Sequence, residues 1–420
     1  MSAFSKIAVA LILTIGVVNT YAADEHAGQE GLTLQRVVLF MRHGVRPPTK
    51  SAEAMAPLSD APWPNEQGWG AAPGELTPHG GMAIRKLGHD LRDYYVGAGL
   101  LPTSGSIASQ TLIWADGADQ RTRETAKMLS RGLTENGFQT GSVHWSNDLP
   151  DPLFDALSTH ICKMDPEAAQ SAVLAEGSLE NREISVALGK MQSVVAPLAC
   201  YTGGGICLAS PSKLTATEQD VKISGPLSTA ATISEVFLLE YENGFPMEQV
   251  AFNRASASEI AQLLLIHEHT SNLTRRTPYI ATRRAFALVQ FILNALSSDS
   301  VNTNVPAINA QQNFIVLIGH DTNLSNLAGV FGLNWHLDGQ PDVTAPGTTI
   351  AFEHWRDNKT GQAILQMRLF YQGMEQVRHL SETPVRSLAI RPAACADSSA
   401  CEMNKLVNEI KSILPKDCHH

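Results

Sequence analysis

The sequence predicts an α/β protein, with a mixed central sheet flanked by helices and a helical subdomain inserted into the chain. Three observations predict this fold. Short buried strands alternate with helices in the N-terminal third, residues 151–276 contain mainly helical segments with few β-branched runs, and three of the strands end in clusters of polar residues. The chain has 420 residues and is 44% hydrophobic, so it can bury a large core.

The N-terminus has the features of a secretory signal. Lys6 supplies a basic start, an apolar stretch follows from Ile7 to Val18, and Thr20 and Ala22 are small residues before a cleavage point. The alternative, a retained membrane anchor, is disfavoured because the apolar stretch is too short to span a bilayer comfortably. We therefore expect residues 1–22 to be a signal peptide and the mature protein to be exported, either periplasmic or secreted, with no membrane association.

The first two strand–helix units follow the signal. Leu34–Met41 reads as a buried strand, a polar loop covers residues 51–74, and Thr77 with Pro78 starts a helix that runs to about Tyr95. Gln110–Ala115 reads as the second strand, and Asp119 is positioned to cap the helix after it. Both strands are followed by polar residues, so the polar groups collect at strand ends.

The next segments are predominantly helical. Ser228–Glu240 has apolar residues to bury, Ser256 and Glu259 form a capping box, and Pro278 opens a helix that extends to Leu296. We assign residues 156–276 to an inserted helical subdomain. Residues 23–155 and 277–420 are expected to form the α/β domain.

The C-terminal part supplies further strands. Asn313–Gly319 reads as a third buried strand, which ends in His320 and Asp321. Thr348–Trp355 and Ala363–Gln372 read as an antiparallel pair across a short turn. These strands complete the predicted mixed sheet.

The polar clusters at the three strand ends point to one anion site. In open α/β sheets the carboxyl edge is where ligands bind. Arginine binds phosphate oxygens through several planar donors, so Arg42, Arg46 and Arg121 within an acidic chain indicate a local site for a phosphate-like group. The formal net charge of −10 argues against nucleic acid or an anionic membrane surface as a general partner.

The same clusters contain the groups needed for phosphoryl transfer. His43 can attack phosphorus as a nucleophile, and the surrounding cations keep its imidazole neutral. Asp321 is the natural proton source for the departing alcohol. Asp116 and Asp119 are expected to cap helices or to orient arginines.

The six cysteines suggest three disulfides in an exported protein. Cys200 with Cys207 and Cys395 with Cys401 each enclose a short, turn-rich loop, which leaves Cys162 with Cys418. No cysteine pair has the spacing of a zinc site, and no glycine-rich phosphate loop lies between a strand and a helix. His267 and His269 fall on different helix faces and are assigned structural roles. We expect neither a metal nor a cofactor.

The run RHGVRPPTK, together with GHDTN downstream, resembles the histidine acid phosphatases, and particularly their exported bacterial phytase branch. Further similar segments are GELTPHGG, DQRTRETA, PDPLF, EVFLLE and NWHLDGQPD. The resemblance implies a phosphoglycerate-mutase-like mixed sheet with helices on both sides, and a helical subdomain over the active-site edge. It also supports the pairing of Cys162 with Cys418.

The resemblance implies a role for each candidate residue. His43 is the nucleophile, Asp321 is the proton donor, and the phosphoryl group is held by Arg42, Arg46, Arg121 and His320. Lys50 and Arg284 would line the outer pocket for a polyanionic substrate, although either could be an ordinary solvated charge. The phytases of this family have arginine where this chain has His79, and no cysteine precedes Cys162 here.

These features together predict a monomeric, metal-independent acid phosphomonoesterase that acts through a phosphohistidine, with inositol polyphosphates as favoured substrates. Three alternatives stay open at this point: a broad-specificity or sugar-phosphate phosphatase of the same family, a phosphate-binding protein without turnover, and a phosphoryl mutase. The phosphate-binding protein has no need of the His43 and Asp321 pair, and export disfavours the mutase.

Overall fold

The computed structural model describes residues 31–138, 141–142, 151–202, 205–297, 307–398 and 400–418. The predicted signal peptide lies outside these residues. In the part of the chain that is described, no helix is both long enough and apolar enough to cross a membrane.

A mixed sheet of eight strands forms the centre of the described structure, and β1 (Leu32–Arg42) lies in its middle. On one side β1 pairs in parallel with β6 (Phe314–Gly319), which in turn pairs in parallel with β2 (Thr111–Ala115). On its other side β1 pairs antiparallel with β7 (Thr349–Asp357). The order is β10-β8-β7-β1-β6-β2-β3, with β9 also paired to β8; the remaining strands are β3 (Gly141–Ser142), β8 (Ala363–Tyr371), β9 (Arg386–Ile390) and β10 (Cys401–Glu402).

Because β1, β6 and β2 are adjacent and parallel, their carboxyl ends meet at one edge of the sheet. This arrangement confirms the three predicted buried strands, with their ends shifted by one or two residues. It also confirms that β7 and β8 form an antiparallel pair.

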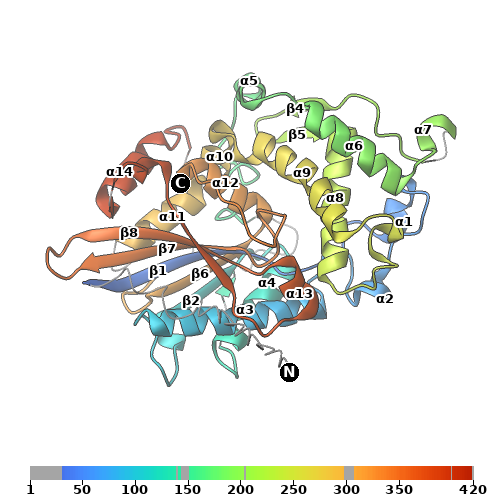
Figure 1. Ribbon diagram of the computed structural model, residues 1–420. Helices are drawn as coiled ribbons and strands as arrows, with labels where there is room; N and C mark the ends of the chain where they lie inside the picture. The colour runs from blue at the N-terminus through green and yellow to red at the C-terminus, as the bar shows by residue number, and fades with distance from the viewer. Residues whose placement is uncertain are drawn as a thin grey trace, which may run out of the picture.

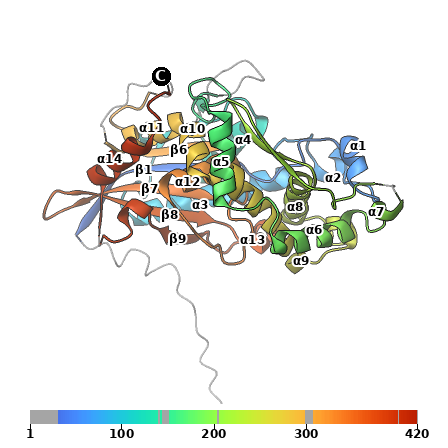
Figure 2. The same ribbon diagram turned by 90° about the horizontal axis from the view of Figure 1, so that it is seen from above.

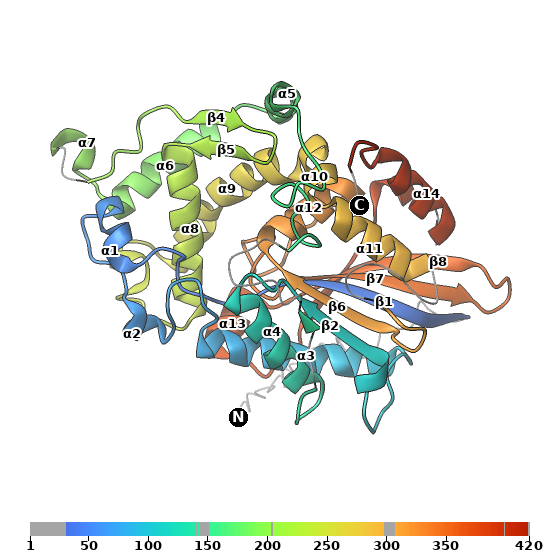
Figure 3. The same cartoon turned by 180° about the vertical axis from the view of Figure 1, so that it is seen from behind.

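Successive residues of β1 point to opposite faces of the sheet, and helices cover both faces (Figures 1 and 3). Val37, Leu39 and Met41 pack into a cluster with α3 (Pro78–Gly97) and α4 (Gln120–Leu133). Val38 and Phe40 face a second cluster, which includes residues of α11 (Phe286–Ser297), α12 (Asp321–Phe331) and α14 (Met403–Ile413). The fully apolar sequence of this strand therefore reflects burial on both sides.

The pair α3 and α4 packs closely. A Cβ added to Gly132 of α4 would lie 2.0 Å from the carbonyl oxygen of Arg85 in α3. A side chain at this position would push the two helices apart. Their close approach fixes α4, whose first turn follows the end of β2.

Residues 156–276 contain most of a group of helices at one end of the sheet (Figures 1 and 2). These helices are α5 (Pro166–Glu176), α6 (Arg182–Val195), α7 (Ala199–Thr202), α8 (Pro226–Glu242) and α9 (Ala257–Ser271). The sequence reading missed a hairpin of β4 (Lys213–Ala216) and β5 (Val221–Ser224), because its strands are short and mostly polar. The division of the chain into two domains stays a prediction.

The capping residues that the sequence predicts mark several helix ends in the structure. Thr77 caps α3 by accepting a hydrogen bond from the Gly80 amide at 2.9 Å, and Ser256 with Glu259 forms the predicted capping box of α9. The polar loop at residues 51–74 also contains two single-turn helices, α1 (Ala52–Met55) and α2 (Glu66–Trp69). A further short helix is α13 (Met374–His379).

The single helix predicted from Pro278 to Leu296 is wrong, because the chain forms α10 (Pro278–Arg284) and α11 with a break at Ala285. The carbonyl of Arg284 accepts a hydrogen bond from the Ala156 amide at 3.1 Å instead of from a later residue of its own helix. A long-range contact thus ends the helix where the local sequence would continue it.

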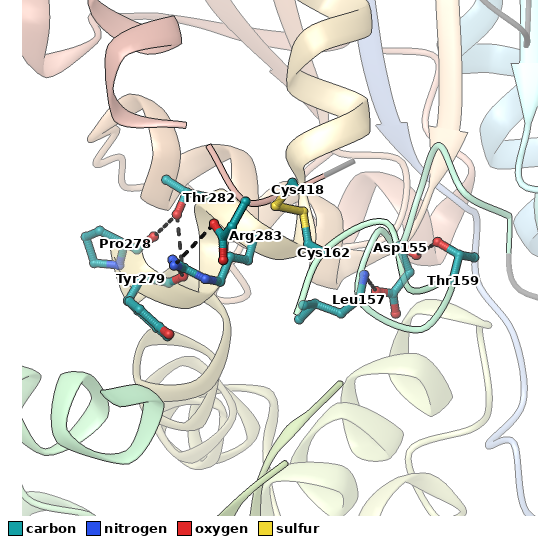
Figure 4. Close-up of a disulfide and its surroundings, with 10 residues drawn as sticks. Asp155, Leu157, Thr159, Cys162, Pro278, Tyr279, Thr282, Arg283 and Cys418 are labelled. Atoms are coloured by element: carbon teal, nitrogen blue, oxygen red, sulfur yellow. Dashed lines mark hydrogen bonds and ion pairs between the residues drawn. A yellow bond between two sulfur atoms is a disulfide. The ribbon is translucent and has the colours of Figure 1, made fainter. Parts of the chain in front are cut away.

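All three predicted disulfides are present: Cys162–Cys418, Cys200–Cys207 and Cys395–Cys401. The first joins the C-terminal segment to the segment around Asp155 and Leu157, beside Thr282 and Arg283 of α10 (Figure 4). It closes a loop across 256 residues and ties the end of the chain to the region next to the sheet edge.

Candidate active site

Backbone hydrogen bonds hold the three strand ends together. The His43 amide donates to the carbonyl of Gly319 at 2.9 Å, and the Asp116 amide donates to the carbonyl of Ile318 at 2.9 Å. The residues that follow β1 and β2 are therefore both anchored to the end of β6. This arrangement brings together the polar clusters that sequence analysis found separately.

His43 is buried, with 1% of its surface exposed, and one of its ring nitrogens has a backbone partner. Nδ1 lies 2.8 Å from the carbonyl oxygen of Gly44. Because a carbonyl can only accept, Nδ1 carries the hydrogen, and in the neutral ring Nε2 keeps its lone pair. The imidazole is thus oriented with the lone pair on Nε2, the atom that a nucleophilic role would require.

The electrostatic environment of His43 keeps it neutral. Burial, followed by the positive charges of three arginines, holds the pKa of the imidazole well below its ordinary value. These arginines are Arg121, Arg42 and Arg46. A neutral imidazole next to several cations is the state required of a nucleophile that attacks a phosphate.

The two arginines of the β1 end share a carboxylate that sequence analysis did not assign. Glu235 of α8 forms an ion pair with Arg42 and a second one with Arg46 at 3.2 Å. Burial opposes the charge of Glu235, but the two arginines outweigh this effect and lower its pKa to about 2. Arg42 also donates to Asp342 at 3.2 Å and to the carbonyl of Thr344 at 2.6 Å.

The end of β2 presents a second arginine–carboxylate pair. Both terminal nitrogens of Arg121 donate to Asp119, at 2.7 and 2.9 Å. Asp119 is the N-cap residue of α4, as predicted, but its side chain makes no capping hydrogen bond and orients an arginine instead, the other role predicted for it. The Asp119 carboxylate binds the guanidinium and not the backbone amides of the first turn of α4, because a two-point, charge-assisted hydrogen bond is stronger than a bond to a backbone amide.

His320 connects the ends of β6 and β2. Its Nε2 lies 2.8 Å from Asp119 and its Nδ1 lies 3.6 Å from Asp116. Its ring faces that of His43 edge-on, with centroids 5.6 Å apart. His320 therefore lies beside His43, as the sequence predicted.

Asp321 follows His320 and opens α12. Its carboxylate forms an ion pair with Arg275, and Nε2 of His267 lies 3.8 Å away. Burial opposes ionisation of Asp321, but the charges of Arg275, then Arg42 and His267, outweigh it and hold its pKa well below the ordinary value. Sequence analysis did not find Arg275, and it gave His267 only a structural role.

The predicted outer-pocket residues differ in their surroundings. Lys50 is exposed and lines a pocket together with Trp63 and Trp69. Arg284 is engaged by two carboxylates, Asp155 at 3.3 Å and Asp220 at 2.8 Å. A substrate-binding role stays a prediction for both residues.

Two other histidines have structural partners. His79 lies with its Nε2 2.8 Å from the carbonyl of Val377, and so connects the start of α3 to α13. His269 contacts the carbonyl of Leu179 at 3.0 Å. Neither ring faces the residues gathered around His43 through a described contact.

Three ligand atoms that could hold a metal ion lie within 4.8 Å of one another, on Asp116, Asp119 and His320, in the part of the chain that is described. Arg121 and His320 already engage the Asp119 carboxylate. We assign no metal chemistry to this group.

Comparison with known proteins agrees with this geometry. Residues 33–372 match the family model of the histidine phosphatase superfamily, branch 2. The chain belongs to this superfamily.

Three individual proteins show which members of the superfamily this chain is similar to. The chain is 33% identical to phytase AppA of Escherichia coli (strain K12) over 405 residues, which cover 90% of this chain and 92% of the relative. It is 26% identical to glucose-1-phosphatase of Salmonella typhimurium, with 92% of each chain covered. The solved structure of Hafnia alvei phytase in complex with tartrate has a TM-score of 0.84 and 31% identity, and the match covers 93% of this chain and 99% of that one. These similarities confirm the predicted family and fold.

Proposed function

We propose that this protein is an exported acid phosphomonoesterase that forms a phosphohistidine on His43, with inositol polyphosphates as its favoured substrates. The observation that carries the proposal is the neutral, oriented imidazole of His43 among three arginines. A protein that only binds phosphate would need the arginines but no nucleophilic nitrogen among them.

The first step would transfer the phosphoryl group to the protein. Nε2 of His43 forms a bond to phosphorus while the bond from phosphorus to the ester oxygen breaks, and the departing oxygen takes a proton from Asp321. Arg42, Arg46, Arg121 and His320 would hold the phosphoryl oxygens. The positive charge of the three arginines favours the transition state because it is already in place when charge redistributes.

The second step would restore the protein. Water attacks the phosphorus of the phosphohistidine and passes a proton to the Asp321 carboxylate, and the bond between nitrogen and phosphorus breaks. Orthophosphate leaves, and His43 returns to its neutral form. Asp321 thereby regains the proton that it gave up in the first step, so no cofactor is needed.

Inositol polyphosphates are favoured as substrates by the similarity to phytases, which exceeds the similarity to glucose-1-phosphatases. Lys50 is exposed beside the loop that carries Arg46 and would add positive charge at the entrance. Three disulfides support export to an oxidising compartment, whether periplasmic or extracellular. We further propose that the protein acts as a monomer on a small phosphate ester, without nucleic acid.

A phosphate-release panel tests the proposal. Purified protein is compared on inositol hexakisphosphate, glucose 1-phosphate and p-nitrophenyl phosphate across the acid pH range. We expect turnover of all three, with the highest kcat/KM for the hexakisphosphate. His43→Ala should abolish release from every substrate; release from p-nitrophenyl phosphate at the wild-type rate would contradict the proposal.

A second variant tests the role of Asp321. Asp321→Asn should slow hydrolysis of glucose 1-phosphate, whose alcohol is a poor leaving group, more than hydrolysis of p-nitrophenyl phosphate. Equal loss on both substrates would remove the role of proton donor from Asp321. A higher kcat/KM for glucose 1-phosphate than for the hexakisphosphate would favour a sugar-phosphate phosphatase instead.

A further inference from the structure

In the free protein, the proposed proton donor is held by a cation that plays no part in the mechanism above. Arg275 lies in the π-helical turn η4 (Asn272–Arg276), and its Nη1 forms an ion pair with Oδ2 of Asp321. The Arg275 side chain is 29% exposed, whereas that of Asp321 is 13% exposed. The pair therefore has a buried acidic end and a basic end that solvent can reach.

The charged groups around Asp321 mostly favour its ionised form. Arg275 is in direct contact, His267 of α9 lies 3.8 Å away, and Arg42 acts from the end of β1. Glu235 of α8 acts in the opposite sense through its negative charge, and Arg121 of α4 also interacts with Asp321. The sum keeps Asp321 ionised in the free protein.

A proton donor has to carry a proton when the ester bond breaks. An arginine in direct contact with the carboxylate opposes that protonation. If Asp321 is the donor, the ion pair with Arg275 must weaken when substrate binds. A negatively charged group of the substrate therefore has to bind the guanidinium of Arg275 in place of Asp321.

A second phosphate group has the right chemistry for this exchange. Phosphate offers several oxygens and close to two negative charges, so it competes well for a guanidinium against one carboxylate. The phosphoryl group that reacts is already assigned to the arginines around His43. A substrate with one phosphate therefore brings no further anion to Arg275, whereas an inositol polyphosphate does.

We propose that Arg275 is a positioning and specificity residue, which holds Asp321 ionised in the free protein and releases it when a second phosphate of the substrate binds the guanidinium. The inference rests on the proposed function. Once released, Asp321 takes a proton from hydronium in the acidic solvent, and this proton later passes to the departing ester oxygen as the bond to phosphorus breaks. The binding of a substrate with several phosphates thereby allows Asp321 to become the protonated donor that hydrolysis requires.

The experiment compares Arg275→Gln with wild type on three substrates. Inositol hexakisphosphate has a poor leaving group and several phosphates, glycerol 2-phosphate has a poor leaving group and one phosphate, and p-nitrophenyl phosphate has a good leaving group that needs little proton donation. Arg254→Gln serves as the matched control. It removes the same charge from an arginine that pairs with Asp60 at the surface, outside the site.

We expect Arg275→Gln to lower kcat/KM for the hexakisphosphate roughly tenfold or more, which corresponds to the loss of one charge-assisted contact. Hydrolysis of glycerol 2-phosphate should not fall, and its decline with rising pH should move to higher pH by about one unit or more because Asp321 binds a proton more readily. Hydrolysis of p-nitrophenyl phosphate and the Arg254→Gln control should stay close to wild type.

Equal losses on the hexakisphosphate and glycerol 2-phosphate, or an unmoved pH profile for glycerol 2-phosphate, would overturn the inference. The proposed function would survive that result as long as His43→Ala abolishes release from p-nitrophenyl phosphate. If Arg275→Gln does not fold, Arg275→Lys decides through the ratio of activities on the two substrates, since lysine keeps the charge but lacks the planar set of donors that a guanidinium offers to a phosphate. It should lower the ratio of hexakisphosphate to glycerol 2-phosphate activity, and an unchanged ratio would overturn the inference.

Discussion

The guanidinium of Arg42 and the carboxylate of Glu235 form an ion pair closed off from solvent, with side-chain exposures of 0% and 10%. The same carboxylate also binds Arg46. The proposed phosphate site therefore contains an anion of its own, supplied by α8. A phosphoryl group must bind beside this carboxylate, which limits how tightly the product can be held.

Replacing Glu235 by glutamine should tighten the binding of orthophosphate about tenfold, because two arginines lose their shared counter-charge. The change should also lower the free energy of unfolding by about 1 to 3 kcal/mol, since buried cations lose an ionic partner. Inhibition of p-nitrophenyl phosphate hydrolysis by orthophosphate measures the first effect. Glu53→Gln, at an exposed site on α1, is the control, and equal inhibition constants for the two variants would contradict this role of Glu235.

Two buried carboxyls of α8 should make the protein more stable in acid than at neutral pH. Burial raises the pKa of Glu240 and of Glu242 to about 8, from an ordinary value of 4.5. Between these two values the folded chain binds more protons than the unfolded chain, so the free energy of unfolding falls as pH rises from 4.5 to about 8. Each group contributes at most about 1.4 kcal/mol per pH unit.

The variant Glu240→Gln/Glu242→Gln should reduce this slope, because glutamine is neutral throughout the range. Urea unfolding of the variant and of wild type at several pH values between 4.5 and 8 measures it. A difference in unfolding free energy between the two proteins that is the same at every pH would show that these carboxyls do not titrate as described.

The activity should be sensitive to substitution of one glycine of α3, which contacts the loop that carries His43, and should tolerate substitution of the next glycine. A Cβ at Gly80 would lie 2.5 Å from the carbonyl oxygen and 2.7 Å from the amide nitrogen of Val45, between His43 and Arg46. At Gly81 the nearest atom is 3.4 Å away, on the flexible side chain of Met128. The first substitution must displace backbone, and the second need not.

Gly80→Ala should therefore lower kcat/KM for p-nitrophenyl phosphate by about a hundredfold, because small displacements of catalytic groups are costly. Gly81→Ala should stay within about twofold of wild type. Kinetics of the two variants, with melting temperatures measured in parallel, test this contrast. Similar activities would mean that the contact between α3 and the loop does not position His43.

The long-range disulfide should matter more for stability than the short one in the helical part. Cys162 and Cys418 are 256 residues apart, whereas Cys200 and Cys207 are 7 apart. On the entropic model, loss of the first costs ~5 kcal/mol and loss of the second ~2 to 3 kcal/mol. Thermal unfolding of Cys162→Ser/Cys418→Ser and Cys200→Ser/Cys207→Ser compares them; a larger loss from the second variant would contradict the prediction.

Much of the fold and part of the site follow from local sequence. β1, β2 and β6 can be predicted because strands buried on both faces are short apolar runs. Since these strands are parallel, the polar clusters that follow them lie at one edge of the sheet. The disulfide pairs follow from loop length and elimination. His43, His320 and the arginines could therefore be named without coordinates.

The remaining parts depend on contacts between distant segments. Glu235 lies on a helix that is buried on nearly all sides, so no polar face marks it as part of a site. The sequence does not distinguish Arg275 from the adjacent Arg276. Only the fold of η4 places Arg275 beside Asp321. The break between α10 and α11 likewise depends on the Ala156 amide, which no periodicity within those helices could reveal.

The most direct test of the account is the capture of the phosphorylated protein. Wild type is mixed with radiolabelled p-nitrophenyl phosphate and quenched within milliseconds in alkaline detergent, because a phosphorus–nitrogen bond survives alkali but not acid. We expect the label on a peptide that contains His43, and none on His43→Ala. Failure to label wild type during active turnover, or equal labelling of the variant, would contradict catalysis through a phosphohistidine at this position.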